Sequence, residues 1–153
     1  MAATDNTARL IEAVRAELLL NSTITGIVGT SGVVRRARAG RAMPYLTIQG
    51  IEEDDDGSHT TDGQEVRFEV HVWVKDGRDA SDGDTLKAAV METLHHSELG
   101  GLSGLVLLQC TGGMGPLPDE DERIAHYVVQ CRALIGHTGL LFIDSAWATE
   151  TTF

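Results

Sequence analysis

The chain has 153 residues, a formal net charge of −11 and 42% apolar residues, enough for one domain with a single hydrophobic core. No run of about 20 apolar residues occurs, so we expect no membrane-spanning helix. The excess of acids argues against a DNA-binding module, because affinity for a phosphate backbone comes from Lys and Arg that displace counterions.

The charges are unevenly distributed along the chain. Arg35, Arg36, Arg38 and Arg41 place a third of the 12 basic residues within seven positions, whereas 12 of the 23 acids lie between residues 52 and 84. Such separation suits head-to-tail association of copies, with an acidic edge against a basic one. Two solvated loops of opposite sign would explain the composition equally well.

The first predicted element is a helix that runs from Thr4, which can cap it, to about Leu20. Four apolar side chains recur along it at helical spacing: Leu10, Ile11, Val14 and Leu18. The next segment contains three glycines in seven residues, between 26 and 32, together with several Ser and Thr. This composition predicts a turn-rich connector, with Val33 and Val34 as a short strand.

Two strands joined by an acidic segment follow. Residues 45–51 alternate between apolar and polar side chains after Pro44, a residue suited to a strand edge. The second strand, Glu65–Val74, places its apolar residues on one side: Val66, Phe68, Val70, Val72 and Val74. We expect the acids that begin at Glu52 to project into solvent between these strands, because burying successive carboxylates would be prohibitive.

The other side of Glu65–Val74 carries charged and aromatic residues: Glu65, Arg67, Glu69, His71 and Trp73. The alternation is too regular for a loop. We therefore expect this side to meet water, a neighbouring subunit or a channel, rather than a second apolar layer.

A second helix is predicted from about Ser81 to His96, with one apolar face: Leu86, Ala89, Val90 and Leu94. Strands at 105–111 and 124–135 flank another acidic hairpin loop, and they carry Cys110 and Cys131, which we expect to be free core thiols. This order predicts an α+β fold, with an antiparallel or mixed sheet of about four to five strands and two α-helices packed on one face.

Residues 137–153 include large apolar side chains but no sustained period; they contain Phe142, Trp147 and Phe153. This segment either packs back on the core or acts as an arm that reaches another chain. We therefore divide the chain into a domain of residues 1–136 and a C-terminal extension of residues 137–153, a candidate partner-binding arm.

No constellation of residues predicts an active site. His95 and His96 are adjacent, so on a helix they point about 100° apart and do not readily serve one site. The acids from Glu52 match the first half of a calcium loop, but Gly63 stands where a bidentate Glu is needed. The glycine-rich stretches hold neither a phosphate-binding loop nor a dinucleotide fingerprint. We therefore predict no enzyme activity, no metal and no cofactor.

Five short segments, in order along the chain, carry a family resemblance. They read A-R-L-I-E-A-V-R-A-E-L, I-T-G-I-V-G, M-P-Y-L-T-I, V-R-F-E-V-H-V-W-V-K and D-T-L-K-A-A-V-M-E-T-L. With this pattern the chain resembles the tail-completion, or tail terminator, family of long-tailed bacteriophages and phage-like gene transfer particles. The resemblance does not account for the extension after residue 136.

The resemblance implies a structural virion protein at the head–tail junction, made and assembled in the bacterial cytoplasm. Such subunits assemble, typically as a sixfold ring, on the end of the tail tube, stop its growth and offer the surface that joins the head's connector. The implied partners are further copies of the chain, the major tail-tube protein and a head connector or stopper. DNA would pass the channel without specific binding, and no membrane is involved.

Two sets of residues are candidates for these contacts. Those for the interface to a neighbouring subunit or another partner are Arg35, Arg36, Arg38, Arg41, His71 and Trp73. Those for the channel or assembly surface are Glu52, Glu53, Asp54, Asp55, Asp56, Glu65, Arg67 and Glu69. An acidic channel lining would lower affinity for phosphates and let DNA pass.

Two alternative functions remain open at this point. A related head–tail connector or stopper would differ mainly in the neighbour that it binds. A small ligand-binding domain or enzyme of similar fold would need a concave pocket with convergent polar groups, which the sequence does not indicate.

Overall fold

The computed structural model describes residues 6–38, 40–55, 63–75, 80–117 and 120–136. In chain order, the elements within these residues are α1 (Asn6–Leu19), α2 (Ser22–Val28), β1 (Val33–Val34), β2 (Tyr45–Asp55), β3 (Gly63–Lys75), α3 (Ala80–Leu94), β4 (Leu105–Leu117) and β5 (Ile124–Gly136). The strands form one sheet in the order β1-β2-β3-β5-β4, with β1 and β2 parallel and all other neighbours antiparallel. The predicted α+β fold with a mixed sheet is confirmed.

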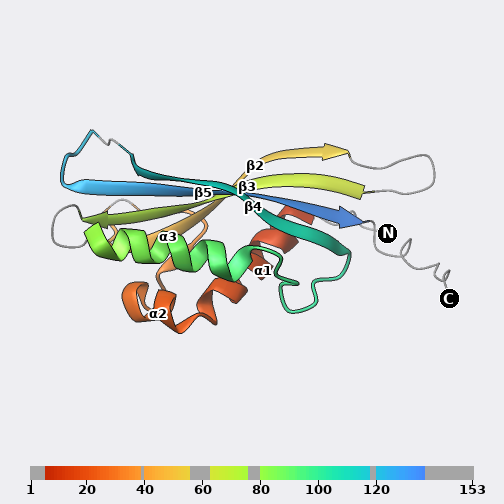
Figure 1. Cartoon of the computed structure of the whole chain (residues 1–153), viewed down its shortest axis with the longest axis horizontal. Helices are drawn as coiled ribbons and strands as arrows, with labels where there is room; N and C mark the ends of the chain where they lie inside the picture. The colour runs from red at the N-terminus through yellow and green to blue at the C-terminus, as the bar shows by residue number, and fades with distance from the viewer. Residues whose placement is uncertain (1–5, 39, 56–62, 76–79, 118–119, 137–153) are drawn as a thin grey trace.

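The three described helices lie on one face of the sheet (Figure 1). α3 packs against β3, β5 and β4, and α1 packs against β2. The predicted apolar faces of α1 and α3 are buried there, and they meet the apolar side of β3, whose five predicted core residues are at most 1% exposed. The core therefore lies between the helices and the sheet.

The segment after α1 forms a third helix, α2, so the prediction of a turn-rich connector is wrong for residues 22–28. Asn21 caps this helix: its side-chain oxygen accepts hydrogen bonds from the backbone N–H groups of Thr23 and Ile24, at 2.8 and 3.3 Å. Ile24 is fully buried, and Asn21 Nδ2 donates to Thr93 Oγ1 of α3 at 2.7 Å. Tertiary packing thus stabilises a helix that Gly26 disfavours.

The acidic segment after Ile51 begins as strand rather than as a loop in solvent. β2 continues to Asp55, and a bulge between Gly50 and Glu52 is followed by pairing of Glu52 with Arg67. Backbone hydrogen bonds to β3 stabilise this extension, although acids are rare in strands.

β4 is also longer than the predicted 105–111, and it continues to Leu117. Gly112 and Gly113 pair with β5, and the register shifts at three places along the strand. Glycines are unfavourable in an isolated strand pattern, so only the pairing with β5 reveals this half of β4.

Cys110 and Cys131 are free thiols that face each other across β4 and β5, with their Sγ atoms 3.7 Å apart. The prediction of free thiols is confirmed. The hydrogen bond from Cys131 to Cys110, together with burial, raises the pKa of Cys131, so this thiol stays protonated.

Several predictions fall outside the described residues and stay predictions. They concern the cap at Thr4, the acid Asp56, and the extension 137–153 with Phe142, Trp147 and Phe153. Of the helices that are described, none has the length and apolar character required to cross a bilayer.

Candidate assembly surface

The face of the sheet opposite the helices has no covering element within the described chain, and we call it the uncovered face. Its polar side chains come from alternate positions of four strands: Tyr45, Thr47, Gln49, Glu52, Glu65, Arg67, Glu69, His71, Trp73, Gln109, His126, Gln130 and Arg132. Because neighbouring strands are in register, these side chains fall into cross-strand rows. The rows divide into an aromatic half and a charged half.

The aromatic half is a stack of four rings. The Trp73 and His126 rings lie 3.8 Å apart at an angle of 6°, His71 lies 4.8 Å from His126, and Tyr45 lies 6.3 Å from Trp73. Trp73 Nε1 donates to Thr47 Oγ1 at 3.2 Å. These contacts hold a rigid aromatic patch, a feature enriched in protein interfaces.

His71 connects the two halves. Its Nε2 lies 2.8 Å from Glu69 Oε1, and its Nδ1 lies 2.6 Å from His126 Nε2. A neutral His71 satisfies both contacts when Nε2–H donates to Glu69 and Nδ1 accepts from His126. The His71 side chain is only 12% exposed, so contacts within the chain replace most of its contact with water.

The charged half is a continuous network of ion pairs and hydrogen bonds. Arg67 donates to Glu52 and to Glu65 Oε1, each at 2.9 Å. Arg132 donates to Glu65 Oε2 at 2.7 Å and to Gln109 Oε1 at 2.8 Å. The charges of Arg67 and Arg132 are therefore neutralised by carboxylates of the same chain. Glu65 accepts hydrogen bonds from both and so links them.

The pKa of Glu65 is held below its ordinary value of 4.5, first by the hydrogen bond from Arg132 and then by the charges of both arginines. A lowered pKa means that ionised Glu65 contributes stability above its ordinary pKa and loses it as the pH falls through the lowered one. We expect the unfolding free energy of Glu65→Gln to depend less on pH below 4.5 than that of the wild type.

Denaturant titrations in steps from pH 5 downward would measure this difference, where pH 5 is about half a unit above the ordinary pKa. Glu92→Gln, on the exposed surface of α3, is the matched control and should keep the wild-type pH dependence. If the unfolding free energy changed with pH equally in all three proteins, the stabilisation of ionised Glu65 by Arg132 and Arg67 would be contradicted.

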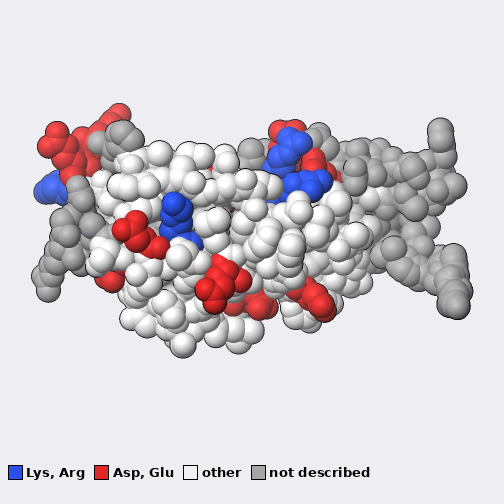
Figure 2. All heavy atoms as spheres, viewed as in Figure 1, with Lys and Arg blue, Asp and Glu red and all other residues white. Residues whose placement is uncertain are grey.

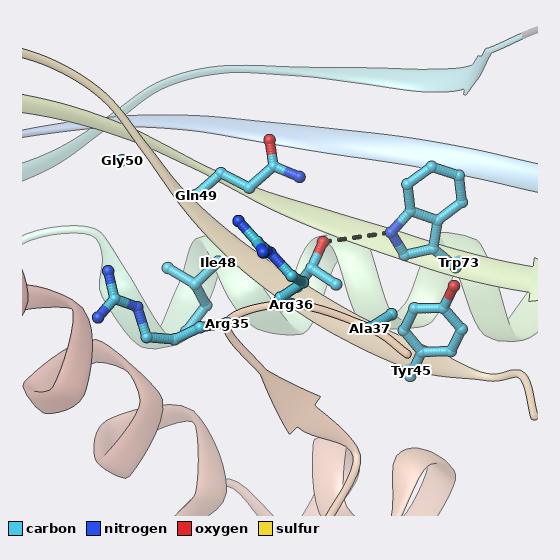
Figure 3. A pocket seen from close by; sticks show the side chains of 9 residues that line it. Arg35, Arg36, Ala37, Tyr45, Ile48, Gln49, Gly50 and Trp73 are labelled. Carbon is cyan, nitrogen blue, oxygen red and sulfur yellow. Dashed lines mark hydrogen bonds between the residues drawn. The ribbon is translucent and has the colours of Figure 1, made fainter. Parts of the chain in front are cut away.

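An open groove of about 720 Å³ lies at the β2 edge of the uncovered face (Figure 3). Its lining comprises Arg35, Arg36, Ala37, Tyr45, Thr47, Ile48, Gln49, Gly50 and Trp73. Figure 3 shows Arg36 reaching toward Gln49, near the hydrogen bond of Trp73 to Thr47, whereas Arg35 extends away from Trp73 and lies beside Ile48. The groove therefore offers cations beside the aromatic stack.

The four arginines predicted as interface residues differ in their contacts within the chain. Arg41 donates to the backbone oxygen of Ser31, and its guanidinium carbon lies 5.8 Å from the centre of the Tyr45 ring. The other three, Arg35, Arg36 and Arg38, are exposed and form no ion pair with any described residue. Arg41 thus holds the loop in place, and the other three present their charges to solvent.

The acids predicted for a channel surface do not form one cluster. Three of them lie on the uncovered face: Glu52, Glu65 and Glu69. Glu53 turns to the helix side, where its carboxylate accepts hydrogen bonds from Thr7 of α1 and from Gln64, the latter at 3.2 Å. Asp54 and Asp55 belong to the end of β2.

Seven polar residues of the uncovered face were missed as site residues: Tyr45, Thr47, Gln49, Gln109, His126, Gln130 and Arg132. The polar positions of 124–135 contained a usable signal, because His126 and Arg132 alternate with apolar residues as those of Glu65–Val74 do. Nothing in the sequence told which strand pairs with which, so their contacts with Trp73 and Glu65 could not be inferred. Among the described residues, no group of three or more His, Cys, Asp or Glu could hold a metal ion.

Comparisons with known proteins identify the family. The sequence matches the family described as tail completion protein gp17 over residues 12–136. The chain belongs to this family. Its members are structural virion proteins, so this chain is a structural protein of a phage-type tail.

Solved structures share the fold of this tail completion protein. A chain from the virion of a native gene transfer agent particle is 22% identical, with 88% of this chain and 100% of that chain covered and a TM-score of 0.73. A second structure, which carries no functional name, is 15% identical, with 88% and 97% covered and a TM-score of 0.51. No curated protein matches the sequence.

Proposed function

We propose that this tail completion protein assembles as a ring, of six copies by the family resemblance, on the end of the tail tube. The ring stops tube growth and offers the surface to which the head's connector or stopper binds. The family match over residues 12–136 carries this proposal. The protein acts at the head–tail junction as a structural component, and it catalyses no reaction.

The two lateral edges of the sheet support a ring. One edge is formed by β1 and β2 with the exposed arginines, and the other is formed by β4, which has no charged residue. Unlike edges cannot form a twofold contact with themselves, but they suit a head-to-tail interface that closes by rotation.

Because the helices cover only one face of the sheet, they support an orientation in which the uncovered face points toward the channel of the ring. In a closed ring the outer circumference is larger than the inner one, so the bulky helices fit outside and the uncovered face lines the channel. On that face Arg67 and Arg132 are already paired with carboxylates. In the charged half of that face both described guanidinium groups are engaged by carboxylates, so DNA phosphates would bind weakly there and DNA would pass without being retained.

Particles that lack this protein are expected to carry tail tubes of uncontrolled length and heads without tails, because nothing would end polymerisation or join the two parts. Electron microscopy of particles from cells with and without the gene, followed by measurement of tube length, tests this. Restoring the gene should restore one tube length. Normal, joined tails in its absence would contradict the proposal.

The same images separate the tail terminator from the alternative connector or stopper. A protein that only joins the two parts would leave capped tubes of normal length beside tailless heads when absent. Labelling the protein at its C-terminus would then place it on the head or on the tube.

A further inference from the structure

The three exposed arginines and an acidic turn lie on opposite edges of the sheet. Arg35, Arg36 and Arg38 follow β1, outside β2. The turn between β4 and β5 contains Glu120 and Glu122, both exposed. Figure 2 shows acidic side chains gathered at the end of the molecule where Figure 1 draws this turn.

The turn presents Glu120 and Glu122 rather than Asp121. Arg123 binds both carboxylate oxygens of Asp121 at 2.9 Å, and its hydrogen bonds lower the pKa of Asp121 to about 2. Neither Glu120 nor Glu122 has an ion-pair partner in the described part of the chain. Two unpaired anions therefore stand on one edge and three unpaired cations on the other.

The strand register places the acidic turn at the Tyr45 end of the sheet, whereas the arginines lie farther along β2. Val33 and Val34 are level with Leu46 and Thr47, so Arg35 and Arg36 continue toward Ile48 and Gln49. Tyr45, which lines the groove with Arg35 and Arg36, is level with Trp73, then His126, then Leu117 at the end of β4. The acidic turn begins just beyond Leu117. In a head-to-tail contact, neighbouring copies can be offset along the strand direction, so the turn of one copy can reach along the groove of the next.

The acids of β2 do not fit this role. Glu52 and Glu53 lie on the same edge strand as the groove, and both carboxylates have partners within the chain. A head-to-tail contact requires its two complementary surfaces on opposite edges. This excludes the pairing of the arginines with the β2 acids of the next copy.

We propose that Glu120 and Glu122 of one copy bind Arg35, Arg36 and Arg38 of the next, and that this contact sets the head-to-tail order of the ring. The inference rests on the proposed ring and adds which surfaces meet. Guanidinium groups suit it because they bind carboxylates through two hydrogen bonds.

Charge reversal with rescue tests the contact. Arg35→Glu with Arg36→Glu, or Glu120→Arg with Glu122→Arg, should each weaken assembly on isolated tail tubes about 100-fold, because like charges would then face each other. The variant with all four changes should assemble again, since the attraction is restored with its signs exchanged. Binding curves from sedimentation with tubes measure the effect.

Glu17→Arg with Glu92→Arg changes the net charge by the same amount as Glu120→Arg with Glu122→Arg. These two residues lie on the helices α1 and α3 rather than in the groove or the turn, so the variant should assemble like the wild type. Circular dichroism should show all variants folded, because every substituted side chain in the contact is exposed. Unchanged assembly of either reversed variant, or failure of the fourfold variant to recover, would overturn the inference while leaving the ring intact as a proposal. Wild-type protein that never assembles on tubes would overturn both.

Discussion

Phe68→Ala is expected to lower the unfolding free energy by about 3–5 kcal/mol, the largest effect of any single truncation that we predict. Phe68 is 1% exposed and lies on β3, between its neighbours β2 and β5 and beneath the helices. Removing its ring deletes buried apolar surface and leaves a cavity that the paired strands cannot close. Urea unfolding followed by circular dichroism measures the loss.

The control for Phe68 is Leu20→Ala. Leu20 directly follows α1 and is 78% exposed, so its truncation should change the unfolding free energy by about 0.5 kcal/mol or less. A Phe68 variant no less stable than the Leu20 variant would contradict the placement of the core between β3 and the helices.

Gly83→Ala is expected to destabilise the protein by about 1–2 kcal/mol, although alanine is the better helix former. A Cβ atom at position 83 of α3 would lie 2.2 Å from Cε1 of Tyr127, whose ring is 1% exposed on β5. The gain in helix propensity is about 1 kcal/mol, so the clash outweighs it. Thermal and urea unfolding of the variant would measure the difference.

Gly26→Ala is the matched control, because Gly26 also lies inside a helix but would place its Cβ with nothing within 4 Å. We expect this change to stabilise the protein by about 0.5–1 kcal/mol through helix propensity alone. If both glycine variants were more stable than the wild type, this would contradict the close packing of α3 at Gly83 against the Tyr127 ring.

Both pairs of variants bear on assembly as well as on stability. Phe68 and Gly83 position the two layers whose one-sided packing leaves the other face of the sheet uncovered. A variant that repacks these layers would alter the edges and the uncovered face together, so assembly defects in such variants do not locate an interface. The exposed residues of the groove and the acidic turn are the informative positions for that purpose.

Regular periodicity within one segment explains which elements could be predicted from the sequence. The apolar stripes of α1 and α3 and the alternation of β3 each predict one buried face. In the structure the apolar residues of these faces are buried. α2 was missed because Gly26 and its Ser and Thr neighbours weaken the local pattern, while the contact that stabilises it, Asn21 to Thr93, joins positions 72 residues apart.

The residues of the uncovered face also fall into those that local periodicity predicts and those that only strand pairing reveals. His71, Trp73, Glu65 and Arg67 could be predicted as surface residues from the alternation of one strand. Their partners His126 and Arg132 lie 55 and 67 residues away from His71 and Glu65, and only the pairing of β3 with β5 brings them together.

The sequence by itself determined the family, the α+β class and the polar side of β3, because these depend on short segments and their periodicity. Only the tertiary structure decided that Arg67 and Arg132 are neutralised by carboxylates, and that the acidic turn lies on the edge opposite Arg35, Arg36 and Arg38. It also decided that these three arginines form no ion pair within the described part of the chain. Strand order and register set these relations, and they arise from contacts between distant segments that no local pattern encodes.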